Sequence, residues 1–221
     1  MPELTLNLEG RAVMVDVRTV IVAGWTGRDR AAVEEHIAEL EALGVPRPSR
    51  APLFYRVSAA RVTTAPEIES TAASSGEVEP VLLHHDGRLW VGVGSDHTDR
   101  EVESYGVAVA KQLCDKPIAD ELWLYEEVEG HWDRLVLRSW IIEHGAEVAY
   151  QEGTLDGLLT PGDLLAQAQP ALADGTLMFC GTFPARGGIR PARAFRYELT
   201  DPELGRSIAG GYAMRELPLV S

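Results

Sequence analysis

The sequence predicts an α+β protein that is mainly β, with a few short helices. Short runs of β-branched and aromatic residues recur along the chain, and turn-forming pairs such as Glu9-Gly10 and Asp86-Gly87 separate some of them. The helical segments are few and do not alternate regularly with strands, as a doubly wound parallel sheet would require. With 45% apolar residues among 221, the chain can bury a substantial core.

The predicted strands are spread over most of the chain. They cover residues 5–8, 12–17, 19–23, 53–57, 81–83, 89–93, 121–127, 134–142, 176–179, 194–199 and 211–217. Residues 66–75 are expected to form a surface connection with little core. No change of composition marks a domain boundary. We therefore expect an N-terminal part of residues 1–50 and a β-rich core of residues 51–221 that together form one structural unit.

Three segments have the features of helices. Residues 29–43 place apolar side chains on one helical face. A second helix is expected at residues 99–113, because Thr98 and Glu101 have the spacing of a capping box. A third, short helix is expected at residues 164–172.

Composition argues against several classes of protein. The formal net charge of −14 is unlike that of a nucleic-acid-binding protein, because phosphate contacts need a basic surface. The chain has no long apolar run, and its first residues do not resemble a signal peptide, so we expect a cytoplasmic protein without a membrane segment. Cys114 and Cys180 do not form a C-x-x-C pair and are expected to be reduced and buried.

An acidic hairpin is the strongest indication of a functional site. Glu77 and Glu79 are two residues apart on a strand, so their side chains leave from the same face. If Asp86-Gly87 forms a type I′ turn, paired residues have numbers that sum to 173, which places Glu77 opposite Asp96. Three neighbouring carboxylates repel one another, and a divalent, oxygen-preferring cation would compensate for this repulsion. Alternatively, the register shifts by one residue and the three carboxylates face solvent.

Two cations are expected to lie near this cluster. Arg100 and Lys111 are eleven residues apart, so one continuous helix would present them on the same face. That face would direct both cations toward the carboxylates. Ordinary salt bridges to Glu103 or Asp115 are the alternative.

A candidate general base lies on the N-terminal helix. His36 and Glu39 are three residues apart, and a carboxylate that orients an imidazole makes a competent base for activating water. The alternative is an ordinary surface pair.

Five segments, in the same order along the chain, resemble motifs of the fumarylacetoacetate hydrolase-like superfamily. The closer resemblance is to a bacterial family of unknown function that lies within or near this superfamily. The segments are residues 23–57 with the H-x-x-E of His36 and Glu39, the E-x-E of Glu77 and Glu79, residues 95–101 with Asp96 and Arg100, residues 111–117 with Lys111, and residues 175–182 with Gly181 and Thr182. The resemblance extends over about 180 of the 221 residues.

The resemblance implies a fold and a set of roles. It implies a mixed β-roll or barrel core, with the helix of residues 1–50 as a lid. Mg²⁺ or Mn²⁺ would be held by Glu77, Glu79 and Asp96. The implied catalytic residues are His36, Glu39, Arg100, Lys111 and Thr182, and the implied substrate contacts are Arg56 and Gly181.

The implied reaction is hydrolysis of a C–C bond in a small α-keto or β-diketo acid, such as an acylpyruvate. Decarboxylation, hydration or isomerisation on the same scaffold is an alternative, and so is a non-catalytic protein that binds a small acid. A homodimer is also implied. Three departures from the motifs alter the pocket, so the substrate does not carry over: Ser95 replaces an asparagine, Glu101 replaces an aspartate, and only 16 residues, 80–95, separate Glu79 from Asp96.

Overall fold

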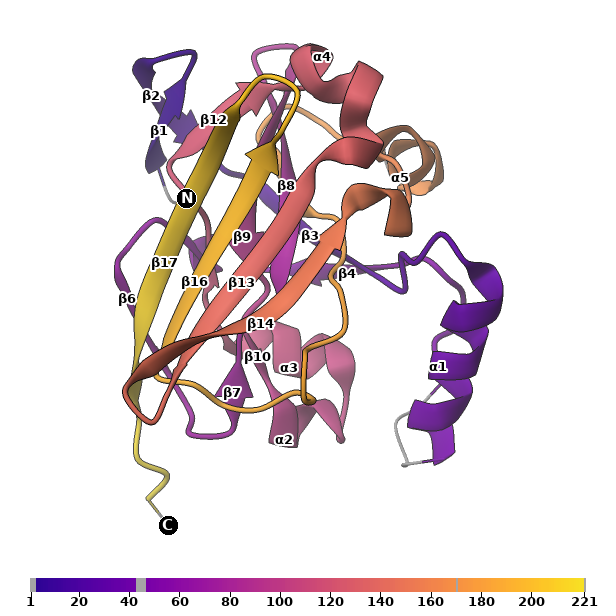
Figure 1. The fold of residues 1–221 in the computed structure, drawn as a ribbon, viewed down its shortest axis with the longest axis vertical. Helices are drawn as coiled ribbons and strands as arrows, with labels where there is room; N and C mark the ends of the chain where they lie inside the picture. Colours follow the sequence, from indigo (N-terminus) through magenta and orange to yellow (C-terminus); the bar gives the residue numbers. More distant parts are fainter. Residues whose placement is uncertain (1–2, 43–46, 170, 221) are drawn as a thin grey trace.

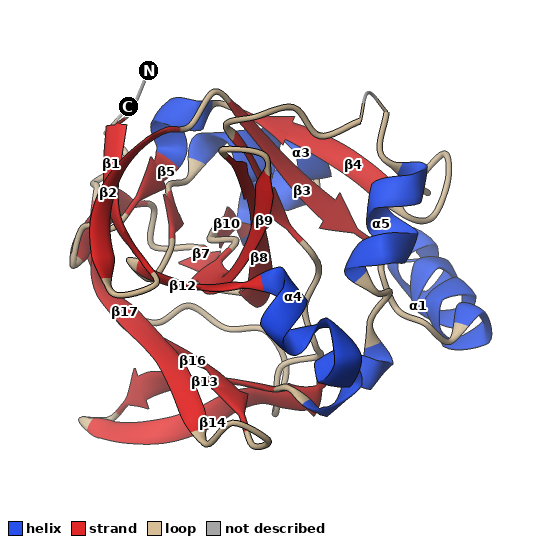
Figure 2. Ribbon diagram, turned by 90° about the horizontal axis from the view of Figure 1, so that it is seen from above, coloured by secondary structure: helices blue, strands red, loops and turns tan. Residues whose placement is uncertain are grey.

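The computed structural model describes residues 3–42, 47–169 and 171–220 and contains two main β-sheets. The eight-stranded sheet has the order β2 (Arg11–Asp16), β1 (Glu3–Leu8), β12 (Glu121–Leu124), β9 (Arg88–Ser95), β8 (Val78–His85), β15 (Thr176–Phe179), β3 (Thr19–Gly24), β4 (Leu53–Val57). The five-stranded sheet has the order β14 (Ala146–Thr154), β13 (Val136–Glu143), β16 (Ala194–Asp201), β17 (Arg206–Glu216), β6 (Glu67–Ser70). Figure 2 shows the larger sheet curling into a partial barrel, with the smaller sheet as a separate layer beside it.

Short elements complete the fold (Figure 1). Two small sheets pair β10 (Thr98–Asp99) with β7 (Ser74–Ser75), and β11 (Lys116–Pro117) with β5 (Val62–Thr63). The α-helices are α1 (Arg30–Ala42), α2 (Arg100–Glu103), α3 (Val107–Leu113), α4 (Tyr125–Val128) and α5 (Pro161–Gln167). Short 3₁₀ helices are formed by Ala59–Arg61, Glu129–Arg134 and Leu155–Gly157. The prediction of a mainly β protein with a few short helices is confirmed.

The core has two parts, one on each side of the curled sheet. Leu82 on β8 and Leu137 on β13 belong to the part between the two sheets. Leu83 on β8 and Phe179 on β15 belong to the part enclosed by the curl. Since β8 is buried on both faces, its sequence is a continuous apolar run in the middle instead of an alternating pattern.

The predicted hairpin of β8 and β9 is present with the predicted register. Asp86 and Gly87 both have positive φ angles, 52° and 69°, as a type I′ turn requires. Pairing runs from His85 opposite Arg88 to Val78 opposite Ser95. Because the register does not shift by one residue, the acidic side chains face the interior instead of solvent.

The predicted helix at residues 99–113 is two helices, α2 and α3. Gly106 between them has φ 179° and ψ 120°, an extended conformation that interrupts the helix. Glycine is unfavourable inside a helix because of its backbone entropy. The capping-box spacing predicts where a helix begins, but it does not predict this interruption. The cap is also displaced by one residue, because the side chain of Asp99 accepts the hydrogen bond from Val102 N–H.

Two other predictions were wrong, and one of the long strands was missed. Residues 66–75 are not a surface connection, because they contain β6 and β7, and Ile68 is only 2% exposed. The strand predicted at residues 121–127 ends at Leu124, where α4 begins. Strand β14 was not predicted at all, since its alternation of polar and apolar residues is weak.

The remaining helices and N-terminal strands are close to prediction. Helix α5 begins earlier than expected, because Thr160 and Asp163 form a capping box ahead of it. Strands β1 to β3 belong to the same sheet as β8 and β9. The division at residue 50 stays a prediction. Among the described helices, none has the length and apolar character needed to cross a bilayer.

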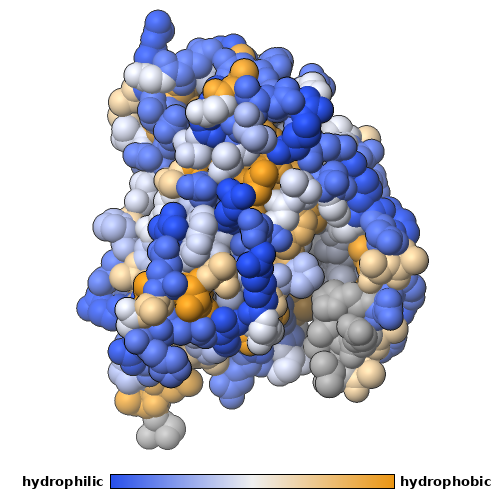
Figure 3. Space-filling model, in the orientation of Figure 1, coloured by the Kyte–Doolittle hydropathy of each residue, from blue (hydrophilic) through white to orange (hydrophobic). Residues whose placement is uncertain are grey.

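The outer face of the five-stranded sheet is largely hydrophilic, with apolar atoms between columns of polar side chains (Figure 3). Arg196 lies over the ring of Trp140, 3.7 Å from its centroid, and forms a two-pronged ion pair with Glu147. A shallow hollow of about 430 Å³ on this face is lined by Trp140, Ile142 and Ala213, among others. The acidic cluster lies elsewhere, at the beginning of β8.

Candidate metal centre

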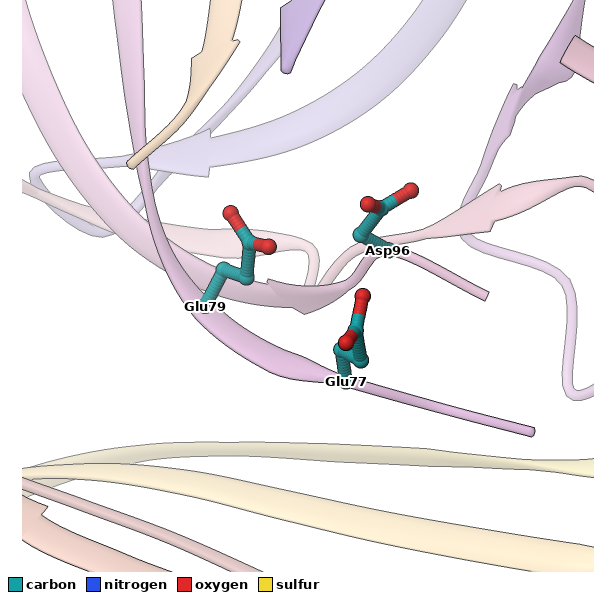
Figure 4. A group of neighbouring side chains, drawn as sticks. All are labelled: Glu77, Glu79 and Asp96. Atoms are coloured by element: carbon teal, nitrogen blue, oxygen red, sulfur yellow. The ribbon is translucent and has the colours of Figure 1, made fainter. Parts of the chain in front are cut away.

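Three carboxylates converge where β8 begins and β9 ends (Figure 4). One ligand oxygen each from Glu77, Glu79 and Asp96 lies within 4.8 Å of the others. Asp96 is fully buried and Glu79 is 2% exposed, whereas the Glu77 side chain is 16% exposed. Asp96 N–H also donates to Glu77 O at 2.9 Å, which continues the hairpin pairing beyond the strands.

The strand that carries the two glutamates is held by a buried amide. Val78 points away from the carboxylates, and its N–H donates to Oε1 of Gln151 at 3.0 Å. Its carbonyl accepts the hydroxyl of Thr182 at 2.7 Å, and Gln151 Nε2 donates to the same hydroxyl oxygen at 2.8 Å. Both backbone polar groups of Val78, the N–H and the carbonyl, are therefore hydrogen-bonded, which holds the backbone between Glu77 and Glu79 in place.

Three cations surround the carboxylates. Lys111 on α3 forms ion pairs with Asp96 and, at 3.4 Å, with Glu77. Arg100 on α2 lies 3.3 Å from Glu77 and donates to Ser75 at 2.7 Å. Although the helix is interrupted, the two predicted cations do meet at the cluster. Arg100 also pairs with Glu103, so the ordinary salt bridge that was the alternative prediction is present as well.

A third cation, Lys116, was not predicted. Its Nζ lies 3.1 Å from Oδ1 of Asp96, and neither side chain is exposed. No local pattern points to Lys116, because it lies twenty residues from Asp96 in a segment without helical or strand periodicity.

Burial and charge shift the acidities within the cluster. Burial raises the pKa of Glu79 well above its usual value, and the charge of Asp96 raises it further. Burial also acts to raise the pKa of Asp96, but Lys111 and Lys116 outweigh it, so this pKa is lowered. Burial alone would lower the pKa of Lys111, but Asp96 and Glu77 raise it above its usual value. Asp96 and Lys111 are therefore both charged at neutral pH, while Glu79 lacks a sufficient positive partner.

The donor set fits a hard divalent cation. All three groups offer carboxylate oxygens, which Mg²⁺ and Mn²⁺ prefer over nitrogen or sulfur ligands. The ammonium group of Lys111 contacts two of the three carboxylates, so a positive charge already lies among them. A divalent ion would place positive charge beside the buried Glu79 and so lower its raised pKa.

A chain of hydrogen bonds with a fixed direction supports the cluster from the second sheet. Ser74 Oγ donates to Thr71 O, so it accepts from His97 Nε2 at 2.8 Å. Nδ1 of His97 must then accept from the hydroxyl of Tyr212 at 2.8 Å. Tyr212 in turn accepts from Ser95 Oγ at 2.9 Å. Ser95 also accepts, at 3.3 Å, the N–H of the first glutamate of the cluster.

Neutral His97 agrees with this direction. Burial, then the charges of Lys116 and Arg100, lower the pKa of His97 to about 3. The imidazole therefore stays neutral and can both donate and accept. Neither His97 nor Tyr212 was predicted as a site residue. The two residues are 115 positions apart, and local sequence patterns do not indicate a contact over such a separation.

The other predicted site residues lie at different distances from the cluster. Gly181 N–H donates to Glu79 Oε2 at 2.6 Å, so this residue holds a carboxylate. The Thr182 hydroxyl is engaged by Val78 and Gln151. Arg56 is exposed and donates to Thr19 Oγ1 at 3.4 Å.

Arg56 and its neighbour on β4 have different surroundings. Tyr55 leaves the opposite face of the strand and lies 6.0 Å from the ammonium of Lys111, measured to the ring centroid. Tyr55 was not predicted as a site residue and faces the cluster. The substrate-binding role of Arg56 stays a prediction.

Helix α1 carries His36 and Glu39, whose side chains lie outside the described part of the structure. Figure 1 shows the helix to one side of the molecule, separated from α3. Apart from Ile37, which is 4% exposed, the described side chains of the helix are exposed or half-buried. The predicted dyad stays a prediction.

Comparisons with known proteins agree with the fold. None of the curated proteins matches this chain. A candidate fumarylacetoacetate isomerase/hydrolase from Oleispira antarctica is 17% identical, with a TM-score of 0.68 over 97% of this chain and 100% of that one. A yeast fumarylacetoacetate hydrolase family protein is 15% identical, with a TM-score of 0.65 over 93% and 96% of the two chains.

One similar structure contains a metal. It is a 2-keto-3-deoxy-D-arabinonate dehydratase complexed with magnesium and 2,5-dioxopentanoate, 14% identical, with a TM-score of 0.60 over 93% of this chain and 77% of that one. The fold is thus that of fumarylacetoacetate hydrolase family proteins, which confirms the resemblance at the level of fold. Residues 23–212 match the profile of a family described as "Protein of unknown function (DUF2848)", and the chain belongs to that family.

Proposed function

We propose that this protein is a Mg²⁺- or Mn²⁺-dependent hydrolase that cleaves a C–C bond in a small α-keto or β-diketo acid. One observation carries the proposal: one oxygen each of Glu77, Glu79 and Asp96 lies within 4.8 Å of the others, beside buried cations. Such an acidic cluster suits a hard cation, and the neighbouring cations suit an anionic substrate. The Mg²⁺-bound dehydratase of similar fold supports the proposal.

The bound ion would act as a Lewis acid toward the carboxylate and adjacent oxygen of a keto acid. Lys111 would neutralise negative charge that develops on the substrate oxygen, since the residue is 6% exposed and its ammonium lies among the ligands. Arg100 forms an ion pair with Glu77, and both side chains are partly exposed. Its guanidinium group would therefore also be available to bind a substrate carboxylate.

His36, oriented by Glu39, is the proposed general base for the attacking water. Since α1 lies to one side, the helix has to approach the cluster when substrate binds (Figure 1). Gly181 and Thr182 serve the reaction by holding Glu79 and the strand of Val78 in place.

A substrate screen tests the proposal. Purified protein is incubated with acylpyruvates, oxaloacetate and related keto acids, with Mg²⁺, with Mn²⁺ and with a chelator, and the products are identified by mass spectrometry. We expect metal-dependent cleavage of at least one compound to two acids, and loss of cleavage in Asp96→Ala. Cleavage that persists in the chelator would contradict a metal-dependent hydrolase.

Dehydration of a keto acid is the second candidate, favoured by the similarity to the 2-keto-3-deoxy-D-arabinonate dehydratase. The two reactions differ in the need for a base that activates water. His36→Gln should abolish hydrolysis of a C–C bond, whereas a dehydration that uses other groups would continue. A third outcome, tight binding of keto acids without any product, would indicate a binding protein.

Assembly as a homodimer is a separate proposal. Sedimentation velocity at micromolar concentration tests it directly, and a single species with the mass of one 24.1 kDa chain would rule it out.

A further inference from the structure

The carboxylates of the metal centre share one arrangement: one oxygen of each lies beside a positively charged group or an N–H group of the protein. For Glu79, Oε2 accepts the N–H of Gly181 at 2.6 Å. For Glu77, Oε1 lies 3.3 Å from Nη2 of Arg100. In both cases the donor leaves the second oxygen of the carboxylate for the centre of the cluster.

Asp96 follows the same pattern with two lysines. Its Oδ1 lies 3.1 Å from Nζ of Lys116, and its Oδ2 contacts Lys111. Lys111 also contacts Glu77 and comes from a helix with exposed residues on its outer side. The two oxygens of Asp96 therefore differ: Oδ2 faces the centre, and Oδ1 faces away from it.

Lys116 is fixed where it lies. Its ammonium donates to His97 O at 2.6 Å and to Cys114 O at 3.2 Å, and it forms the ion pair with Asp96. Two hydrogen bonds to backbone carbonyls and one ion pair therefore hold the ammonium group. Since the side chain is 0% exposed, water cannot replace any of these contacts, and a rotation would leave a buried charge without partners.

A glycine brings Lys116 to this position. The segment of β11 lies against β9 through a bridge between Gly94 and Ile118. A Cβ atom at Gly94 would lie 2.7 Å from Pro117 O, which is too close for any other residue. This close approach places the lysine that precedes Pro117 beside Oδ1 of Asp96.

We propose that Lys116 determines which ion the centre accepts, by confining Asp96 to one oxygen and so favouring Mg²⁺ and Mn²⁺ over Ca²⁺. The inference rests on the proposed metal-dependent function. Ca²⁺ takes six to eight oxygens and often uses both oxygens of a carboxylate, whereas Mg²⁺ needs six ligands in a strict octahedron. A cluster whose carboxylates each offer a single oxygen suits the smaller ion.

Lys116→Met tests this by calorimetric titration with Mn²⁺ and with Ca²⁺. Methionine has a similar length and no charge, so it frees Oδ1 of Asp96. Loss of a positive charge should strengthen binding of both ions, and the ratio of the two affinities removes that common effect. We expect the preference for Mn²⁺ over Ca²⁺ to fall by roughly tenfold in the variant.

Lys111→Met is the charge-matched control. It also removes one positive charge, from beside Asp96 and Glu77, but leaves Oδ1 of Asp96 with Lys116. Its Mn²⁺ to Ca²⁺ ratio should equal that of the wild type. An unchanged ratio in Lys116→Met, or an equal change in both variants, would overturn the role of Lys116. If the wild type binds no divalent ion, the proposed function itself is wrong.

Infrared spectroscopy of the wild type tests the same claim without any variant. In protein labelled with ¹³C at the aspartate side-chain carboxyl, the Mg²⁺-loaded minus metal-free difference spectrum isolates Asp96, the one aspartate among the three ligands. A carboxylate that uses one oxygen has a wider splitting between its two C–O stretches than a free carboxylate, and one that uses both oxygens has a narrower splitting. We expect the wider splitting, and the narrower one would overturn the proposal.

Discussion

Nζ of Lys116 lies 3.1 Å from Oδ1 of Asp96, and both side chains are completely buried. Two charges in such a place stabilise the protein only as a pair, because either one alone would remain without water. Asp96 is thus a structural residue as well as a candidate metal ligand, and the two roles can be separated by experiment.

The first prediction concerns stability without metal. Asp96→Asn leaves Lys116 buried without a carboxylate and leaves Lys111 with Glu77 alone, so we expect the free energy of unfolding to fall by about 3 kcal/mol or more. Glu77→Gln is the comparison. Its side chain is 16% exposed and Arg100 keeps Glu103, so the loss should be smaller. Urea titrations in a chelator measure both, and equal losses would contradict the burial argument.

The second prediction concerns Gly181, which has φ 103° and is buried. A Cβ atom there would lie 1.7 Å from Oγ1 of Thr26. Gly181→Ala should therefore destabilise the protein by several times the roughly 1–2 kcal/mol that positive φ alone costs. Gly10→Ala is the matched control, because Gly10 has φ 76° and nothing within 4 Å of the added atom. Similar thermal shifts for the two variants would refute the steric explanation.

The third prediction concerns the tautomer of His97. The direction of the hydrogen bonds requires a proton on Nε2 and none on Nδ1. ¹⁵N NMR of the imidazole should show this single tautomer at neutral pH. In Tyr212→Phe, Nδ1 loses its donor while the aromatic packing is kept, and its ¹⁵N resonance should move. A proton on Nδ1 in the wild type would mean that the hydrogen bonds run in the opposite direction and would contradict this prediction.

The fourth prediction concerns acid stability away from the centre. Burial acts to raise the pKa of Asp201, but a hydrogen bond from His131 and the N–H groups of Leu204 and Glu203 lower it below its usual value. A carboxyl with a lowered folded-state pKa contributes stability above its unfolded pKa, about 3.9, and loses it as the pH falls through the folded value.

Asp201→Asn should therefore be less stable than the wild type at pH 7, and the difference should shrink as the pH falls below about 4. Urea midpoints between pH 7 and pH 2 provide the comparison. A difference that is constant over this range would mean that the charge of Asp201 does not matter.

The parts that could be predicted from sequence are those with local causes. The turn at Asp86-Gly87 sets the register of β8 and β9 over eight pairs, so two ligands on one strand and the position of Asp96 follow from counting. Helix α1, Arg30–Ala42, lies within the range that the spacing of its apolar residues predicts. Helices α2 and α3 show the limit, because one extended residue, Gly106, outweighs a regular pattern.

The parts that could not be predicted depend on contacts between distant segments. Lys116 reaches Asp96 only because Gly94 lets β11 approach β9, and Tyr212 reaches His97 across 115 residues. No local periodicity encodes such contacts. The roles of Arg56, His36 and Glu39 stay predictions.

Anomalous diffraction from crystals soaked in Mn²⁺ tests the central claim most directly. We predict one strong peak at the beginning of β8, within bonding distance of an oxygen of Glu77, of Glu79 and of Asp96, with Lys111 displaced and Lys116 still on Oδ1 of Asp96. The absence of a peak among these three carboxylates in crystals that hold Mn²⁺ elsewhere would contradict the account.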